Sequence, residues 1–185
     1  MAAVLGGEAP RSDGTLELHV RAVPGGLVSG ALVRHTSVGD RLRLGPPLGG
    51  MQVDPESDRD LLFVAGGTGL APCKAIIEHV ARWNSTRQVR LFYGARRSDD
   101  LYGLSGMCRF AAGLPWLTVV GATSEDPGYF GPHGTVADVA LAAGDWSGSD
   151  AYVSGPPAMV PATVAALRRA GVPLDRIAYD PVTAD

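Results

Sequence analysis

The feature that most constrains the fold is LLFVAGGTGLAP at residues 61–72, a continuous apolar run that leads directly into a glycine-rich turn. An apolar run without alternation is typical of a strand buried on both faces of a parallel sheet. The next segment, KAIIEHVARW, places Ile76, Ile77, Val80 and Trp83 on one helical stripe. Residues 61–83 therefore predict a strand, a tight turn and a helix in immediate succession.

The same alternation continues to the end of the chain. Further strands are expected at VRLFYGA (89–95), LTVVGAT (117–123) and DAYVSG (150–155), with an edge strand at 176–180. Helices are expected within LYGLSGMCRFAAG, GTVADVALAAG and PPAMVPATVAALRRAG. Strands that alternate with helices predict a doubly wound parallel sheet of the α/β class.

The first third of the chain has a different pattern of apolar and polar residues. LELHVRAV, LVSGALVR and DRLRL are separated by PGG and VGD turns, and Leu16, Leu18 and Val20 alternate with polar residues. This period of two predicts antiparallel β structure. The Gly/Pro/Asp-rich stretch at 45–60 is interpreted as a domain junction.

Composition excludes several classes of protein. The 185 residues are 45% hydrophobic, enough for one domain or two small ones. A net charge of −3 with no basic block argues against nucleic-acid binding. Two distant cysteines and four scattered histidines predict neither a disulfide nor a metal site. Without a signal-peptide pattern or a run of about 18 apolar residues, we expect a cytoplasmic protein with no membrane segment.

Two glycine-rich turns follow predicted strands and carry the chemistry of the α/β half. In the first, Gly66, Gly67 and Gly69 expose backbone N–H groups at a helix start, where a phosphate binds, with Thr68 as the hydroxyl. The second is YVSGPPAMV at 152–160, at the same predicted sheet edge, where ligands of open α/β sheets bind. The alternatives are a turn without a ligand and a proline-started helix.

Two further motifs are open to two interpretations each. VPGGLVS at 23–29 offers main-chain N–H groups and a serine hydroxyl to a phosphate, or forms a plain hairpin turn. Arg96 and Arg97 follow the second strand of the α/β half, where a ribose or its 2′-phosphate is contacted. Alternatively, they are a solvated pair balanced by Asp99 and Asp100.

The ordered motifs VPGGLVS, GDRLRLGPPLG, AGGTGLAP, YGAR…DLY, GTVADV and SGPPAM resemble the ferredoxin–NADP reductase superfamily. The similarity is to the reductase parts of flavohaemoglobins and to reductases that serve bacterial oxygenases. It implies a fold of class α/β plus β: a partial antiparallel FAD-type β-barrel at 1–56 and an NAD(P)-binding α/β domain at 57–185. The implied activity is an FAD-dependent NAD(P)H oxidoreductase. Hydride would pass from NAD(P)H, with NADH favoured, to the flavin, and electrons to a partner oxygenase, a haem protein or a small acceptor.

The resemblance also implies roles for individual residues. Thr68 and Ser154 would lie at the flavin–nicotinamide contact as catalytic residues. The implied FAD-binding residues are His19, Val20, Arg21, Gly26, Leu27, Val28 and Ser29. The implied nicotinamide-nucleotide residues are Gly67, Thr68, Gly69 and Pro72 for the pyrophosphate, Arg96 for the ribose, and Gly155, Pro156, Pro157 and Met159 beside the nicotinamide.

Three departures from the family pattern bear on flavin binding. Ala2 to Leu5 stand where the family carries its Arg-x-Tyr-Ser flavin motif, and Ser154 stands where it carries a cysteine. The barrel of the family needs about six strands and this sequence supplies about three, which leaves sheet edges exposed. The sequence thus reads as an N-terminally truncated member, and we expect weak FAD binding.

Two alternatives to the reductase therefore stay open. The first is a flavin-less nucleotide-binding module whose barrel is completed by a partner chain or by a second copy in a homodimer. The second is a non-redox enzyme that uses the cleft between the domains. Its candidate polar groups are His19, Ser29, Thr68, Cys73, Ser154, Tyr179 and Asp180.

Overall fold

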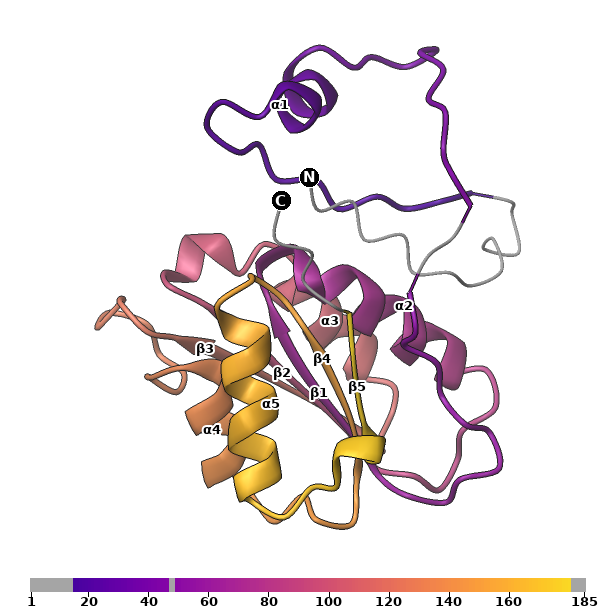
Figure 1. The fold of residues 1–185 in the computed structure, drawn as a ribbon, viewed down its shortest axis with the longest axis vertical. Coiled ribbons are helices and arrows are strands. Elements are labelled where there is room, and N and C mark those ends of the chain that lie inside the picture. Colours follow the sequence, from indigo (N-terminus) through magenta and orange to yellow (C-terminus); the bar gives the residue numbers. More distant parts are fainter. Residues whose placement is uncertain (1–14, 47–48, 181–185) are drawn as a thin grey trace.

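The computed structural model describes residues 15–46 and 49–180. Its centre is a five-stranded sheet in the order β3-β2-β1-β4-β5, with every neighbouring pair parallel. The strands are β1 (Leu61–Gly66), β2 (Val89–Ala95), β3 (Leu117–Thr123), β4 (Asp150–Ser154) and β5 (Ile177–Tyr179) (Figure 1). The doubly wound parallel sheet predicted from the sequence is confirmed.

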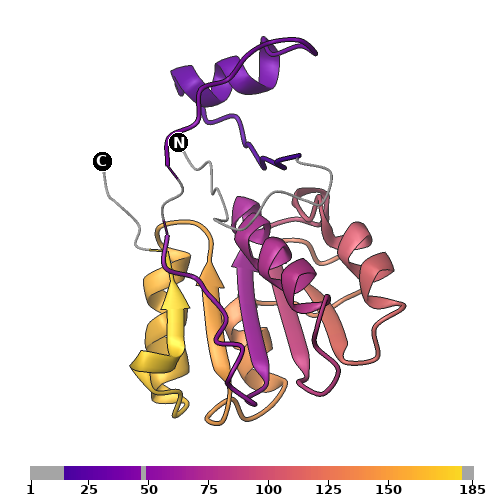
Figure 2. The same cartoon turned by 90° about the vertical axis from the view of Figure 1, so that its right-hand side faces the viewer.

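Helices cover both faces of this sheet (Figure 2). On one face lie α2 (Leu70–Val80) and α3 (Leu104–Ala111), and on the other α4 (Val136–Ala142) and α5 (Met159–Arg169). Short 3-10 turns occur at η1 (Gly67–Gly69), η2 (Ser98–Asp100) and η3 (Leu174–Arg176). Every residue of β1 is buried, which explains why its sequence is apolar without alternation.

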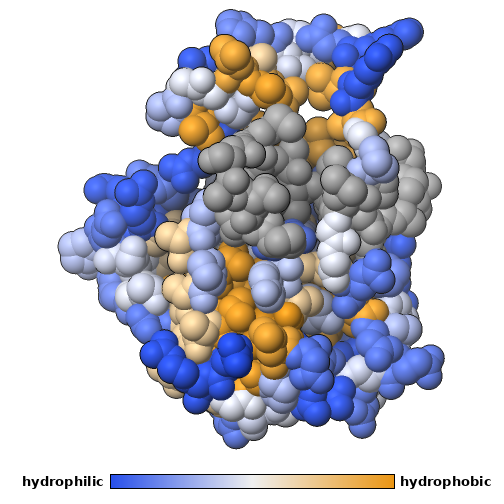
Figure 3. Space-filling view, viewed as in Figure 1, coloured by the Kyte–Doolittle hydropathy of each residue, from blue (hydrophilic) through white to orange (hydrophobic). Residues whose placement is uncertain are grey.

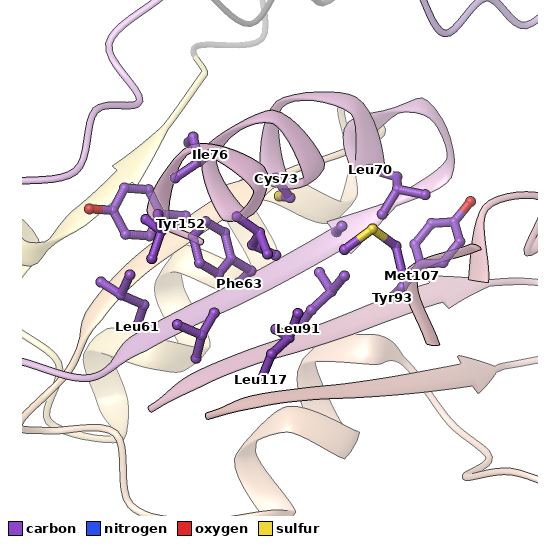
Figure 4. Packing of buried hydrophobic residues seen from close by; sticks show 14 of the residues in the cluster. Leu61, Phe63, Leu70, Cys73, Ile76, Leu91, Tyr93, Met107, Leu117 and Tyr152 are labelled. Carbon is purple, nitrogen blue, oxygen red and sulfur yellow. The ribbon is translucent and has the colours of Figure 1, made fainter. Parts of the chain in front are cut away.

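Alternate residues of β1 enter two separate cores. Leu61 and Phe63 pack with α2, where Phe63 stacks on Tyr152 at a centroid distance of 4.8 Å (Figure 4). Leu62 and Val64 pack on the opposite face with residues of α4 and α5. Burying both faces of the central strand fixes its position, and with it the position of the turn that follows.

The expectation of antiparallel strands in the first third of the chain is wrong for the described residues. Residues 27–34, expected as a strand, form helix α1 (Leu27–Arg34), and no strand occurs in 15–46. This segment lies beyond the carboxyl edge of the sheet (Figures 1 and 2). A strand needs a hydrogen-bonded neighbour, whereas a helix satisfies its backbone within the segment, so 27–34 takes the conformation that needs no partner. The described residues 15–46 thus form no part of the expected β-barrel.

The junction at 49–60 is anchored to the sheet by a buried arginine. Arg87 is 4% exposed, and its guanidinium donates to the carbonyls of Arg59 and Asp54 and to the carboxylate of Asp150, the last at 3.4 Å. The Tyr152 hydroxyl donates to the Gln52 carbonyl at 3.1 Å. These bonds fix the chain where it enters β1.

The segment around α1 exposes several apolar side chains. Leu27, Val28, Val33 and Val38 are all at least half exposed, and hydrophobic side chains are visible on this segment in Figure 3. Among residues 15–46 and 49–180, no helix has the length and apolar character needed to cross a membrane.

Candidate functional site

The site lies where the strand order reverses. The chain runs from β1 outward through β2 and β3, and then returns to the other side of β1 as β4. In open α/β sheets, the crevice at the carboxyl ends of two such strands is the usual place for a ligand. Here η1 follows β1 and the Gly155-Pro156 turn follows β4, so both predicted motifs border this crevice.

The backbones of these two turns are in direct contact. A Cβ atom placed on Gly69 would lie 2.2 Å from the carbonyl oxygen of Ser154 and 2.6 Å from the nitrogen of Gly155. A Cβ on Gly66 would lie 2.4 Å from the sulfur of Met159. Glycine at both positions lets the turn after β1 pack against the turn after β4.

Gly67 faces open space instead. Its φ of +52° lies in the left-handed region, and a Cβ there would meet no atom within 4 Å. Neither η1 nor α2 has a side-chain cap, so the N–H groups at the start of α2 have no side-chain acceptor. An open backbone at the positive end of a helix dipole suits an anionic group such as a phosphate.

A cavity of about 580 Å³ extends from this turn. It is bounded by the N-terminal segment, the loops after β1, β2, β3 and β4, and the first turns of α4 and α5. Its lining residues are Val20, Arg21, Gly66, Gly67, Thr68, Gly94, Ala95, Arg96, Asp99, Asp100, Tyr102, Ser124, Gly134, Thr135, Val136, Ala137, Pro156, Ala158, Met159, Ala162 and Thr163. Such a space accommodates an extended ligand with polar groups at several points.

The structure brings many of the predicted site residues to this cavity. Those that line it are Val20, Arg21, Gly67, Thr68, Arg96, Pro156 and Met159. Gly69, Ser154 and Gly155 make the backbone contact behind it. Pro72 is buried in the first turn of α2, and Pro157 is exposed on the rim.

The other predicted residues lie elsewhere. His19 bonds to Glu17 and Tyr102. Gly26, Leu27, Val28 and Ser29 form the start of α1, apart from the sheet domain (Figure 1). The Ser29 hydroxyl is buried and accepts a hydrogen bond from the Val23 N–H at 3.2 Å, so it is already used within the turn.

Sequence reasoning missed the wall formed by Tyr102 and by the start of α4. Thr135 caps α4. Its hydroxyl oxygen accepts a hydrogen bond from the Asp138 N–H at 3.2 Å, and the hydroxyl donates one to the Asp138 carboxylate at 2.7 Å. A threonine followed three residues later by an acidic residue is a helix-start signal that could have placed this wall.

The charges around the cavity are balanced. Two arginines, Arg21 and Arg96, and two aspartates, Asp99 and Asp100, line it. Burial raises the pKa of Tyr102 to about 12, so its hydroxyl keeps its proton at neutral pH. Across residues 15–46 and 49–180, no three His, Cys, Asp or Glu side chains gather in a way that could hold a metal ion.

A hydrogen-bonded pair fixes the loop that carries these aspartates. The Ser98 N–H and hydroxyl both donate to the carboxylate of Asp126, the first at 3.0 Å. These bonds lower the pKa of Asp126. The loop after β2 is thereby joined to the loop after β3 at the edge of the cavity.

Comparison with known proteins identifies the family. The family model for the oxidoreductase NAD-binding domain matches residues 63–165. The reductase component of propane 2-monooxygenase from Rhodococcus jostii is 34% identical over 179 residues, which are 93% of this chain and 48% of the relative. The reductase component of phenol 2-monooxygenase from Pseudomonas sp. is 36% identical over 163 residues, 85% of this chain and 46% of the relative.

Solved structures agree with these relatives. The cytochrome P450 reductase of Amycolatopsis superposes with a TM-score of 0.83 at 36% identity, over 89% of this chain and 51% of that one. The ferredoxin reductase of carbazole 1,9a-dioxygenase superposes with a TM-score of 0.80 at 34% identity, over 91% of this chain and 51% of that one. The chain spans about half the length of the relatives that it matches. The resemblance to ferredoxin–NADP reductases is confirmed, and the chain belongs to the oxidoreductase NAD-binding domain family.

Proposed function

We propose that this chain is the NAD(P)H-binding part of a reductase component that supplies electrons to an oxygenase. The observation that carries the proposal is the open, left-handed Gly67 at the uncapped start of α2, beside a cavity of about 580 Å³. The relatives named above are reductase components of oxygenases, which supports this assignment. A bound nicotinamide nucleotide supplies the hydride, and the protein supplies binding, orientation and exclusion of water.

In this proposal each group at the crevice has one task. The backbone of Gly67 and Gly69 and the Thr68 hydroxyl hold the pyrophosphate at the start of α2. Arg96 contacts the ribose side. Residues 155–159 form the wall beside the nicotinamide, with Thr68 at the reacting face and the buried Ser154 behind this wall, where its backbone packs on Gly69.

NADH is the favoured cofactor on electrostatic grounds. Asp99 and Asp100 line the cavity next to Arg96. A 2′-phosphate would bring negative charge toward these two carboxylates, and that repulsion offsets the attraction of the arginine. The ribose of NADH carries no such group.

For FAD, we propose the start of α1 as the phosphate contact, with residues 1–56 as the flavin-side domain and 57–185 as the nucleotide domain. The main-chain N–H groups of Leu27 and Val28 lie at a helix start that no side chain caps, whereas the Gly26 N–H donates to the Val23 carbonyl at 2.9 Å. Ser29 is 5% exposed and its oxygen accepts from the Val23 N–H, so its burial, and not the use of its proton, keeps this hydroxyl from the phosphate contact. Ala2 to Leu5 lie outside the described residues. We expect weak FAD binding by this chain.

A second candidate function is a nucleotide-binding module without flavin. It is favoured by one observation: residues 15–46 contain no strand, so the described part of the flavin-side half has no sheet. A partner chain or second copy would then complete the barrel. For a non-redox enzyme no comparable observation exists, since among its proposed polar groups only Thr68 lines the cavity.

The visible absorption spectrum of the purified protein tests the proposal. The protein is mixed with FAD, desalted, and then treated with NADH under anaerobic conditions. A retained flavin band that bleaches with NADH supports the reductase. Loss of the flavin band, with NADH binding still detectable by fluorescence, supports the flavin-less module. Absence of NADH binding contradicts both.

A further inference from the structure

Four polar side chains connect the N-terminal segment to the nucleotide domain. Both carboxylate oxygens of Glu17 lie 2.6 Å from the ammonium of Lys74 on α2. Glu17 also lies 2.7 Å from Nε2 of His19, and Nδ1 of His19 bonds to the Tyr102 hydroxyl. We call Glu17, His19, Lys74 and Tyr102 the polar clasp.

The hydrogen bonds of the clasp have a consistent direction. The Glu17 carboxylate can only accept, so Nε2 of His19 donates to it, and with the imidazole neutral Nδ1 accepts from the Tyr102 hydroxyl. The Lys74 ammonium donates to that same carboxylate. The imidazole is only 10% exposed at the side chain, and its ring meets that of Tyr102 edge-on at 5.4 Å. The clasp thus orders His19 between two fixed partners.

The clasp ends at the wall of the cavity. Tyr102 lines the cavity, and the two residues after His19, Val20 and Arg21, line it as well. Residues 15–21 belong to no strand, so no sheet hydrogen bonds hold them there. Glu17 and Lys74 are outside the lining and reach the cavity only through the clasp.

We propose that the polar clasp is a positioning device that holds Val20 and Arg21 as a wall of the nucleotide cavity and couples nucleotide binding to the placement of the N-terminal segment. The proposal rests on the proposed nucleotide-binding function. Coupling of this kind is reciprocal. If docking of the segment increases the affinity for the nucleotide, bound nucleotide favours docking of the segment by the same factor. Because the segment leads into α1, the clasp links the nucleotide site to the proposed flavin-side domain.

Charge reversal at the remote end of the clasp tests this proposal on the full chain. Glu17→Lys and Lys74→Glu each place like charges together, and Glu17→Lys/Lys74→Glu restores an opposite pair. NADH affinity is measured by fluorescence titration at low salt. Since a partly exposed ion pair contributes about 1 kcal/mol or less, each single variant is expected to weaken NADH binding by up to about fivefold. The double variant restores the opposite pair but sets an ammonium beside Nε2 of His19, so it is expected to bind NADH more tightly than either single variant and more weakly than the wild type.

Glu78→Gln is the matched control. Glu78 also pairs with Lys74, at 3.4 Å, but lies one turn along α2 and not on the N-terminal segment. This variant removes a charge beside the same lysine and is expected to leave NADH affinity within twofold of wild type. A loss as large as that of Lys74→Glu would overturn the proposal.

Proteolysis supplies a second readout that concerns only the segment. Arg21 is a trypsin site, and its peptide bond to Ala22 is monitored by mass spectrometry. NADH is expected to slow this cleavage in the wild type and in the double variant, and to protect the single variants less. The proposal is overturned if the single variants match the wild type in affinity and protection, or if the double variant binds NADH no more tightly than the single variants. A wild type that binds no NADH would instead refute the proposed function itself.

Discussion

Replacing Gly69 with alanine tests the contact on which the crevice depends. The backbone of Gly69, at φ −62° and ψ −9°, is open to any residue, so the substitution introduces no conformational strain. The added methyl group would lie 2.2 Å from the Ser154 carbonyl oxygen and 2.4 Å from its carbonyl carbon. Both are backbone atoms of a buried strand end and cannot rotate away. The turn after β1 and the turn after β4 must therefore separate.

Overpacking of this kind costs about 1–3 kcal/mol, and the rigid backbone places Gly69→Ala near the upper end. At about 2–4 °C per kcal/mol for a chain of this size, the melting temperature is expected to fall by about 5–10 °C. NADH affinity is expected to fall as well, because the separated turns no longer present the phosphate site in one geometry. Circular dichroism during heating and in urea measures the first effect, and fluorescence titration the second.

Gly106→Ala is the matched control, since Gly106 lies within α3 and a Cβ there meets no atom within 4 Å. Only helix propensity then applies, and the free energy of unfolding of this variant is expected to rise by up to about 1 kcal/mol. The two Gly→Ala changes thus have opposite expected signs. A Gly69→Ala protein as stable as the wild type would refute the argument that the two turns touch.

Three further predictions concern other parts of the chain. Arg87→Met is expected to lower the free energy of unfolding in urea by about 2–3 kcal/mol, because it leaves the carbonyls of Arg59 and Asp54 without their buried donor and Asp150 with only its Ser57 and Arg59 partners. An unchanged urea midpoint would contradict this. The Lys74 ammonium lowers the pKa of Glu17 from 4.5 to about 2, so the stabilisation from this carboxylate is fully present above pH 4.5 and is lost as pH falls toward 2. The gap in melting temperature between wild type and Glu17→Gln is expected to close over that interval, and a constant gap would argue against the ion pair. Cys108 is exposed whereas burial raises the pKa of the Cys73 thiol. A thiol reagent such as Ellman's is therefore expected to modify Cys108 in the native protein and Cys73 only after unfolding, and rapid native reaction of Cys73 would show that α2 opens.

The α/β half could be predicted from the sequence because its strands are buried on both faces. The six residues of β1 have no solvent side, and the run LLFVAG reports this directly. The helix that follows carries Ile76, Ile77 and Val80 toward the sheet, which is the stripe visible in the sequence. Trp83, expected on the same stripe, lies beyond the end of α2 and is 41% exposed. For the other residues of these elements local pattern and tertiary burial agree, so the type of each element was predictable.

Residues 27–34 could not be assigned from pattern in the same way. LVSGALVR is short and mostly apolar, and such a run is compatible with a strand or with two turns of helix. The expected strand depended on neighbours that would pair with it, and no described part of 15–46 provides one. Gly25 at φ +73° turns the chain, and Ser29 closes that turn through the Val23 N–H. These contacts lead the chain into α1.

The three glycines of the turn after β1 show why the site could not be assigned in detail from the sequence alone. In the sequence GGTG they are equivalent, and all three suggest close approach of a ligand. In the structure, Gly66 and Gly69 leave room for Met159 and for the Ser154 backbone, so they serve the packing of the protein against itself. Only Gly67 combines a left-handed backbone with open space beside it. A Cβ on Gly69 would meet backbone atoms, so a substitution there should reduce the free energy of unfolding and NADH affinity together, whereas at Gly66 the end of the Met159 side chain can shift and the loss should be smaller. An alanine at Gly67 would add backbone strain of about 1–2 kcal/mol, which lowers the free energy of unfolding. The loss of NADH binding free energy at this position should be larger than that.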